Sequence, residues 1–445
     1  MLDIGLHATL PLMPRITIIG AGSVEFTRNI LADLCSYPEL RGTLTIALHD
    51  IDAERLETSE RVASDTNERT GAGATIEAHL ERRPAFEGAD YLINEIQVGG
   101  YAATLRDFEI PKKYGVRQTI GDTLGIGGIL RGLRTIPVMV QMADDMAELC
   151  PNALLLNYTN PMAMVPWGIY AGSRFSNVVG VCHSVRDTHR FLAETVGVPE
   201  EDVVFTTAGL NHQCFVYRFE RRGGEDLYPR LRAIVDADPE GLGRRVRVEI
   251  FKRFGYFPTE SSEHSSEYVP WFLRHDDQIE RFRILVDDYV FRSDENLEEY
   301  ERTKAALDAG EALEIEPTSE LASEIVHSME TGVPRQVSCN VRNGGLIGGL
   351  PEDACVEVPC LVDKNGVQPT RIGTIPPQTR ALNQAFASVV ELTVHAALEE
   401  CRDLVYQAAL LDPNTAATLP TDEIVALCDD LLEAHGDLIP PGIRT

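Results

Sequence analysis

Two kinds of segment alternate through the first two hundred residues of the chain. Short apolar runs predict buried strands at 14–20, 43–49, 91–98, 153–157 and 178–182. Between them, longer stretches with apolar positions three or four residues apart predict helices at 26–35, 54–68 and 130–149. Strands that alternate with helices in this way are typical of an α/β fold with a doubly wound parallel sheet.

The pattern becomes mixed after about residue 204, where short strands stand among long helical stretches. The clearest of these predicts a helix at 382–406. A chain of 445 residues exceeds what one hydrophobic core usually serves, so we expect two domains. We expect an N-terminal extension at 1–13, a first domain at 14–203, and a C-terminal mixed α+β domain at 204–445.

A glycine turn joins the first predicted strand to the first predicted helix. Gly20 permits the tight turn, Gly22 lets a pyrophosphate approach the backbone, and Ser23 opens the helix whose free N–H groups face the negative charge. The third glycine of the usual pattern is absent, since Glu25 occupies its place. Asp50 ends the next strand, where its carboxylate can accept hydrogen bonds from the adenosine ribose and repel a 2′-phosphate. The first domain is therefore predicted to be a Rossmann domain that binds NAD.

Charge and composition exclude several classes of partner. The chain has 40 basic and 69 acidic residues, a formal charge of −29, which argues against binding to nucleic acid or to an anionic membrane. No apolar run is long enough to span a bilayer, and residues 1–12 do not read as a signal or transit peptide. The nine cysteines form no CxxC pair. Reduced thiols in a cytoplasmic protein are the expectation.

Polar residues with chemical potential gather where the predicted strands end, which is the usual ligand crevice of such a sheet. They lie in four segments, at 155–161, 180–185, 209–213 and 255–268. Each segment alone has a simple structural reading, since a cysteine can pack as a small apolar residue and a single histidine is usually satisfied in a loop. A cysteine, two histidines and several asparagines at successive strand ends favour a catalytic site beside the nicotinamide.

Together these segments resemble glycoside hydrolase family 4, the NAD- and metal-dependent glycosidases. The resemblance runs from about residue 14 to residue 400. Its motifs are the segments 20–23, 121–128, 157–161, 182–185, 209–212, 343–345, 350–351 and 356–359.

The resemblance implies a distinctive chemistry. NAD takes a hydride from C3 of a sugar, a base removes the acidified C2 proton, and the aglycone leaves by elimination. Water then adds, and the NADH returns its hydride. A divalent metal would stabilise the enolate charge as a Lewis acid. The match to the family assigns Cys182 and His212 as metal ligands, with Mn²⁺ the usual ion and Fe²⁺, Co²⁺ or Ni²⁺ compatible with the same donors.

The resemblance also implies that the domain at 204–445 binds the substrate and the metal, and it implies roles for other residues. His183 matches the position of the acid, and a histidine can deliver a proton near neutral pH. Tyr268 is the candidate for the C2 base, with Glu263 and His264 as alternatives. Two further residues are expected to contact the sugar, namely Asn160 and Asp122.

The expected substrate is an unphosphorylated α-galactoside. Gln97 stands where family members that act on 6-phosphosugars typically have arginine, and Cys182-His183-Ser184-Val185 is the form associated with α-galactosidases. An α-glucuronide, α-galacturonide or α-glucoside remains an alternative.

Two other classes share the Rossmann start, a lactate- or malate-type dehydrogenase and a non-catalytic NAD-sensing or scaffold protein. The first needs no metal, and the second is expected to lack Cys182 or His212, both of which are present. The family forms dimers and tetramers, so a homodimer or homotetramer is expected.

Overall fold

The computed structural model describes residues 13–315 and 318–444, so the expected extension lies, apart from Met13, outside the described residues. Six parallel strands form the N-terminal part of the main sheet. They are β1 (Arg15–Ile19), β2 (Thr45–His49), β3 (Thr75–His79), β4 (Tyr91–Asn94), β5 (Leu154–Asn157) and β6 (Val178–Val181). Their order is β3-β2-β1-β4-β5-β6. This order defines the doubly wound nucleotide-binding sheet and confirms the predicted Rossmann fold.

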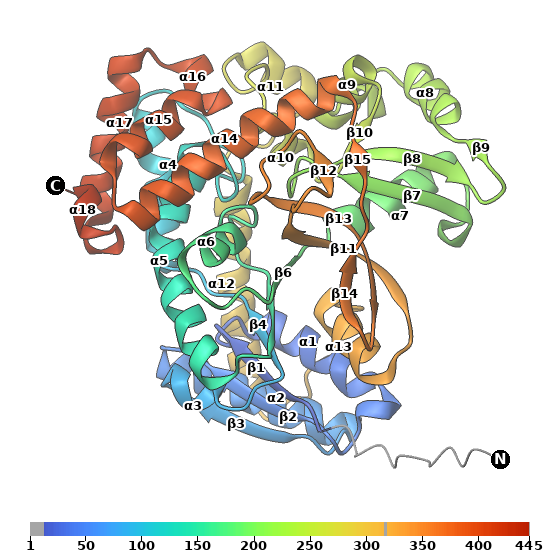
Figure 1. Ribbon diagram of the computed structural model, residues 1–445, viewed down its shortest axis with the longest axis vertical. Helices are drawn as coiled ribbons and strands as arrows, with labels where there is room; N and C mark the ends of the chain where they lie inside the picture. The colour runs from blue at the N-terminus through green and yellow to red at the C-terminus, as the bar shows by residue number, and fades with distance from the viewer. Residues whose placement is uncertain (1–12, 316–317, 445) are drawn as a thin grey trace.

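Helices cover both faces of these strands (Figure 1). The helices of this part are α1 (Val24–Ser36), α2 (Ala53–Thr70), α3 (Arg82–Phe86), α4 (Gly100–Lys113), α5 (Gly125–Leu149), α6 (Val165–Gly172) and α7 (Ser184–Val196). In Figure 1, α3, α5 and α6 lie on one side of the strands, and α1 and α2 lie on the other. Apart from the edge strand β3, these strands are largely buried on both faces, which explains their nearly continuous apolar runs.

The C-terminal half of the chain extends the same sheet. Beyond β6 follow β11 (Arg335–Arg342), β13 (Cys355–Asp363) and β14 (Gly366–Pro369), all paired antiparallel. The complete order is β14-β13-β11-β6-β5-β4-β1-β2-β3. Strands from both sides of residue 204 thus share one sheet, and the expected domain boundary at 203 and 204 stays a prediction.

A second, smaller sheet lies beside the main one. It consists of β7 (Val203–Ala208), β8 (Phe215–Arg221), β9 (Glu225–Asp226) and β10 (Phe257–Pro258), while β12 (Ile347–Gly348) pairs with β15 (Gly373–Thr374). The chain that leaves β7 is also tied to the main sheet. Gly209 and Glu357 of β13 exchange backbone hydrogen bonds of 3.3 and 2.8 Å. This pairing fixes the turn between β7 and β8 against the carboxyl end of the main sheet.

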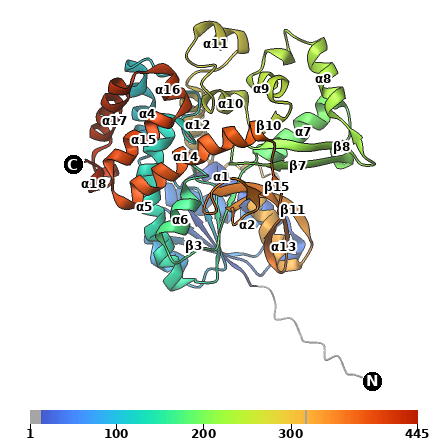
Figure 2. The same cartoon turned by 45° about the horizontal axis from the view of Figure 1, so that its top comes forward.

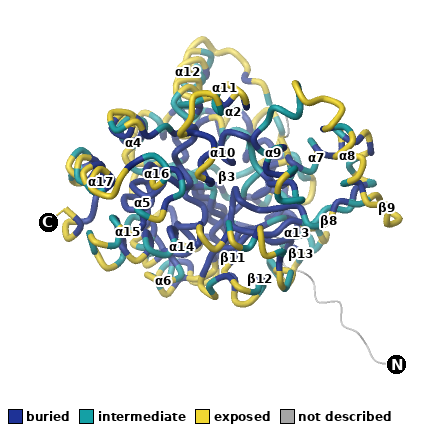
Figure 3. The backbone as a smooth tube through the Cα atoms, turned by 90° about the horizontal axis from the view of Figure 1, so that it is seen from above, coloured by how far each residue is buried: buried dark blue, intermediate teal, exposed yellow. Residues whose placement is uncertain are grey.

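Helices fill the rest of the C-terminal half. They are α8 (Tyr228–Ala237), α9 (Val246–Phe254), α10 (Ser262–Glu267), α11 (Asp276–Phe282), α12 (Asp288–Asp308), α13 (Leu321–Thr331), α14 (Pro377–Glu399), α15 (Arg402–Leu411), α16 (Pro413–Thr418), α17 (Thr421–His435) and α18 (Pro441–Arg444). The last five pack beside α4 and α5 (Figure 2). Figure 3 shows the strands as the buried centre and the outer faces of α11, α12 and α17 as exposed. Among the described residues, no helix is long and apolar enough to cross a bilayer.

The structure corrects several predicted elements. The single helix expected at 382–406 is two helices, because Glu400 adopts a left-handed conformation with φ of 52° and ends α14. The strand expected at 91–98 ends at Asn94, and the helix expected at 130–149 begins at Gly125 and continues through Pro137. Neither β3 nor α4 was predicted. The residues of β3 are exposed or half-buried, so it lacks the apolar run that marked the other strands.

A buried ion pair joins three helices of this fold. The guanidinium of Arg134 in α5 lies 2.6 Å from the carboxylate of Asp107 in α4, and Nε2 of His435 in α17 lies 2.8 Å from the same carboxylate. All three side chains are almost completely buried. Removing one member of such a group leaves an unpaired buried charge, which costs about 3–5 kcal/mol.

We therefore expect Asp107→Asn to lower the free energy of unfolding by about 3–5 kcal/mol, because Arg134 keeps its charge without its partner. Chemical denaturation measures the change. Asp353→Asn, which breaks the exposed pair with Arg342, is the control and changes stability by less than about 1 kcal/mol. An equal decrease in the free energy of unfolding in both variants would contradict a stabilising role of the Asp107–Arg134 pair.

Candidate active site

The predicted nucleotide turn has the geometry that the glycines imply. Gly20 has φ of 85°, and a Cβ there would lie 3.0 Å from the backbone nitrogen of Ile96. A Cβ on Gly22 would lie 2.6 Å from the Asp50 carboxylate, to which the Gly22 N–H donates at 2.8 Å. Ser23 precedes α1, is exposed and makes no capping bond with its side chain. Gly20, Gly22 and Ser23 thus lie in one turn, which packs so closely against Ile96 and Asp50 that neither glycine has room for a side chain.

The strand ends beside this turn carry the predicted polar residues. Asn94 ends β4 and donates from its amide to Asn157 at 2.8 Å and to Thr159 at 2.9 Å. Asn160 lies in the loop after β5, and its amide donates at 2.8 Å to the carboxylate of Asp122. The structure therefore brings Asn160 and Asp122 together, although Asp122 precedes α5 and Asn160 follows β5.

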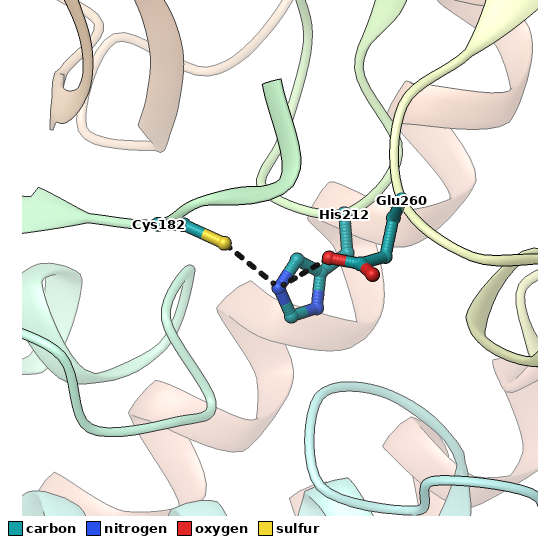
Figure 4. Close-up of side chains that lie close together, drawn as sticks. All are labelled: Cys182, His212 and Glu260. Atoms are coloured by element: carbon teal, nitrogen blue, oxygen red, sulfur yellow. Dashed lines mark hydrogen bonds and ion pairs between the residues drawn. The ribbon is translucent and has the colours of Figure 1, made fainter. Parts of the chain in front are cut away.

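Cys182 and His212 meet as predicted, and Glu260 joins them (Figure 4). Cys182 follows β6, His212 lies in the turn after β7, and Glu260 lies between β10 and α10. Nε2 of His212 lies 3.2 Å from the Cys182 sulfur and 3.3 Å from a Glu260 oxygen. One ligand atom from each residue lies within 4.8 Å of the others. Glu260 lies in the predicted polar segment 255–268, but neither spacing nor a motif singled it out as a partner of the other two.

Backbone conformation aims two of these side chains. His212 has φ of 66° and Glu260 has φ of 74°, both in the left-handed region that residues other than glycine rarely adopt. Such conformations are unfavourable and persist where the surrounding structure imposes them, often at functional sites. The backbone carbonyl of Glu260 accepts a bond of 3.0 Å from the half-buried Arg247, which helps to hold this turn.

The second nitrogen of His212 is fixed by a short chain of hydrogen bonds. The Thr123 hydroxyl donates to Asp122 at 2.8 Å and lies 3.0 Å from Nδ1 of His212. Because the hydroxyl proton points to Asp122, Nδ1 is the donor to Thr123. The lone pair of His212 is then on Nε2, which faces Cys182 and Glu260.

The charges of the three residues are strongly coupled. Burial opposes protonation of His212, but the charges of Cys182 and Glu260 outweigh it and raise the pKa of His212 to about 10. Burial acts against ionisation of Glu260, but His264 and His212 outweigh it and lower the pKa of Glu260 to about 2. A proton on Nε2 and a cation would compete for the same place between two anionic groups.

The donor set fits a divalent transition metal. Bonds of about 2.0–2.3 Å to sulfur, nitrogen and oxygen put ligand atoms at right angles roughly 3 Å apart. The separations of 3.2 and 3.3 Å at Cys182, His212 and Glu260 match such an arrangement. Mixed thiolate, imidazole and carboxylate donors suit Mn²⁺, Fe²⁺, Co²⁺, Ni²⁺ or Zn²⁺.

His183 is held by a residue that the sequence did not suggest. Its Nε2 lies 2.8 Å from the carboxylate of Glu320, which precedes α13. Burial opposes the charged ring, but the hydrogen bond and charge of Glu320 outweigh it and raise the pKa of His183. His183 therefore lies beside Cys182 with a carboxylate partner of its own.

The three candidate bases lie at different places around His212. The Tyr268 hydroxyl is 3.4 Å from Nδ1 of His212, and burial raises the pKa of Tyr268 well above its usual value. His264 accepts or donates at 3.0 Å to the Ser261 hydroxyl, and burial lowers its pKa to about 4. Glu263 pairs with Arg245 at 3.1 Å. The assignment of the base to Tyr268 stays a prediction.

Comparison with known proteins identifies the family. The model for family 4 glycosyl hydrolases matches residues 15–198, and the model for the C-terminal domain of that family matches residues 207–415. This chain belongs to family 4 of the glycosyl hydrolases. The predicted resemblance is thereby confirmed, and a match through residue 415 leaves no support for a lactate- or malate-type dehydrogenase.

Relatives of this family 4 enzyme match over nearly the whole chain. An α-galactosidase of Bacillus subtilis is 40% identical over 434 residues, covering 96% of this chain and 99% of the relative. An α-galactosidase of Rhizobium meliloti is 35% identical over 438 residues, covering 96% and 89%. A solved 6-phospho-α-glucosidase from gut microorganisms, in complex with NAD and Mn²⁺, superposes with a TM-score of 0.81 at 22% identity, covering 96% and 99%.

The loop that carries Asp122 and Thr123 is anchored by Glu267 of α10. The Glu267 carboxylate accepts backbone N–H bonds from Thr119, Ile120 and Gly121, the longest of which is 3.1 Å. Bonds of this kind to a carboxylate are strong, and a lost one leaves a buried N–H group unpaired.

We expect Glu267→Gln to lower the free energy of unfolding by about 1–3 kcal/mol, because an amide accepts fewer of these bonds. Amide hydrogen exchange at residues 119–121 should accelerate as well, which mass spectrometry measures. Glu301→Gln, at an exposed position of α12, is the control. Unchanged exchange at 119–121 would show that Glu267 does not hold the loop.

Proposed function

We propose that this family 4 enzyme hydrolyses unphosphorylated α-galactosides and that it requires NAD and a divalent metal, Mn²⁺ in the first place. The observation that carries the proposal is the convergence of Cys182, His212 and Glu260 beside the carboxyl ends of a Rossmann sheet. The two α-galactosidases at 40% and 35% identity support the choice of sugar.

The nucleotide would bind at the turn before α1. Gly20 and Gly22 form the tight turn that precedes α1, Ser23 and the free N–H groups of α1 would face the pyrophosphate, and Asp50 would accept hydrogen bonds from the adenosine ribose. NAD, when bound, accepts a hydride from C3 of the sugar and later returns it. The solved relative with NAD and Mn²⁺ is in keeping with both cofactors.

The metal would be held by Cys182, His212 and Glu260, with Fe²⁺, Co²⁺ or Ni²⁺ as alternatives to Mn²⁺. The ion supplies Lewis acidity, which stabilises negative charge on the oxidised sugar. His212 is presented for this purpose by Thr123 and Asp122, since their hydrogen bonds leave its Nε2 lone pair free.

The remaining residues would act directly on the sugar. His183 donates the proton to the departing glycosidic oxygen, and Tyr268 removes the C2 proton, with Glu263 and His264 as alternatives. Asn160 and Asp122, which already bond to each other, contact the sugar hydroxyls.

The choice of an unphosphorylated sugar depends on Gln97 and on the segment Cys182-His183-Ser184-Val185. Gln97 donates from its amide to Thr104 at 2.8 Å and offers no positive charge to a phosphate. α-Glucuronides, α-galacturonides and α-glucosides are the alternative substrates for the same mechanism. We further propose a homodimer or homotetramer in the cytoplasm, with no nucleic-acid or membrane partner.

We expect p-nitrophenyl-α-D-galactoside to be cleaved only when NAD⁺ and Mn²⁺ are both present, because the oxidation and the charge on the oxidised sugar each need one of them. The assay follows released p-nitrophenol beside the glucoside, the glucuronide and a 6-phosphoglucoside, with either cofactor omitted in turn. No net NADH should accumulate.

Faster cleavage of the 6-phosphoglucoside would contradict the substrate assignment, and cleavage without either cofactor would contradict the mechanism. Accumulation of NADH without cleavage would indicate a dehydrogenase.

We expect Glu260→Gln to weaken Mn²⁺ binding by at least about 10-fold, since the variant loses an anionic donor at the ion. Isothermal titration calorimetry of the purified protein measures this affinity independently of activity. Glu240→Gln, at a position that is 84% exposed, is the matched control and should bind Mn²⁺ as the unchanged protein does. Equal affinity in both variants would show that Glu260 is only an ion-pair partner of His212.

A further inference from the structure

Glu320 is a buried carboxylate at the edge of the site that belongs to none of the segments with sequence motifs. Its side chain is 7% exposed, whereas that of His183 is 35% exposed. One oxygen lies 2.8 Å from Nε2 of His183 and 3.2 Å from the hydroxyl of Tyr158. The carboxylate thus lies behind the histidine, on the side away from solvent.

Glu320 is fixed from several directions. Its backbone N–H donates to the carboxylate of Asp33 in α1, which also accepts from the backbone N–H of Thr318 at 2.6 Å. Tyr158 donates its hydroxyl to Glu320 and accepts the N–H of Ala322 at 3.0 Å. Because these bonds hold the Glu320 carboxylate in one orientation, it can fix the orientation of the His183 ring.

The ring of His183 is fixed as well. It stacks on the ring of Tyr158, with centroids 5.9 Å apart and planes 26° apart, and Phe26 lies edge-on to Tyr158 at 4.7 Å. Phe26 is the third residue of α1, directly after the nucleotide turn. The histidine is therefore clamped between aromatic packing and one carboxylate.

This arrangement selects which nitrogen of His183 is available for chemistry. An ionised carboxylate only accepts, so Nε2 carries the hydrogen that points to Glu320. Of the two ring nitrogens, Nε2 is the one that is bonded to Glu320. The bond from Nε2 to Glu320 fixes the ring and leaves Nδ1 as the nitrogen that can face a substrate, in the manner of histidines oriented by a buried carboxylate.

We propose that Glu320 is a positioning residue that holds His183 with Nδ1 toward the glycosidic oxygen, so that His183 can protonate the leaving group. The proposal depends on the proposed function. In the step, the electron pair left on C2 after deprotonation forms the C1=C2 double bond and the C1–O bond breaks. The pair of that bond stays on the glycosidic oxygen, which takes the proton from Nδ1. His183 is left neutral, with its Nε2–H still bonded to Glu320.

Two substrates with different leaving groups distinguish a positioning role of Glu320 from a purely structural one. Alkoxides need a proton to depart, whereas p-nitrophenolate departs without one. In Glu320→Gln and Glu320→Ala we expect kcat for methyl α-D-galactoside to fall about 10²–10³-fold and kcat for the p-nitrophenyl substrate to fall less than about 10-fold. The same variants should still exchange the C2 hydrogen of the uncleaved substrate for deuterium in D₂O, because removal of the C2 proton precedes protonation of the leaving group. NMR measures this exchange.

Two further variants separate positioning from support of the fold. Glu324→Gln, the control, removes the partner of Arg186 one turn along α13 and should leave both substrates unaffected. Tyr158→Phe removes the hydroxyl that also holds Glu320 but keeps the ring that stacks on His183, and it should produce the same dependence on the leaving group in a weaker form.

Equal losses on both substrates, or loss of C2 exchange in the Glu320 variants, would overturn the proposal. If Glu320→Ala does not fold, Glu320→Gln, which keeps the shape of the side chain, decides the matter. Failure of the unchanged enzyme to cleave any α-galactoside with NAD and Mn²⁺ would instead overturn the proposed function, so the two results are distinguishable.

Discussion

The site depends on the pairing of Gly209 with Glu357. Cys182 directly follows β6 of the Rossmann sheet, and His212 lies in a turn of the smaller sheet, thirty residues away. β11 pairs with β6, β13 pairs with β11, and Glu357 of β13 exchanges two backbone bonds with Gly209. Because this ladder is continuous, it sets His212 3.2 Å from Cys182. The end of a Rossmann strand is thereby joined by His212, a residue from outside the Rossmann sheet, at one place.

Opposing charges then shape the centre. Cys182 and Glu260 lie next to Nε2 of His212. The hydroxyl of Thr123, which is bonded to Asp122, lies next to Nδ1. Groups of this kind are costly to bury unless they are paired or bind a cation. His212 and Glu260 also hold left-handed backbone conformations, so part of the folding energy is spent on aiming them. The arrangement is suited to an ion that replaces the proton between the two anionic groups.

Much of this could be predicted from the sequence, because local pattern determines it. The glycine turn, Asp50 and the apolar strands identify the Rossmann domain, and the family motifs lead to Cys182 and His212. Glu260 and Glu320 could not be found in this way, since their roles arise from turns that meet only in the folded chain. The antiparallel strands β11, β13 and β14 were missed for the same reason, because pairing between residues 180 and 340 leaves no periodic signal. The break at Glu400 depends on one left-handed residue within an otherwise helical pattern.

The central claim is that the glycosidic bond is broken by oxidation and elimination rather than by direct displacement. The most direct test is hydrolysis of an α-galactoside in D₂O with NAD⁺ and Mn²⁺, followed by NMR of the released galactose. Removal of the C2 proton and its later replacement from solvent predict deuterium at C2. Galactose that keeps its original hydrogen at C2 would contradict the mechanism, whatever the rate of hydrolysis.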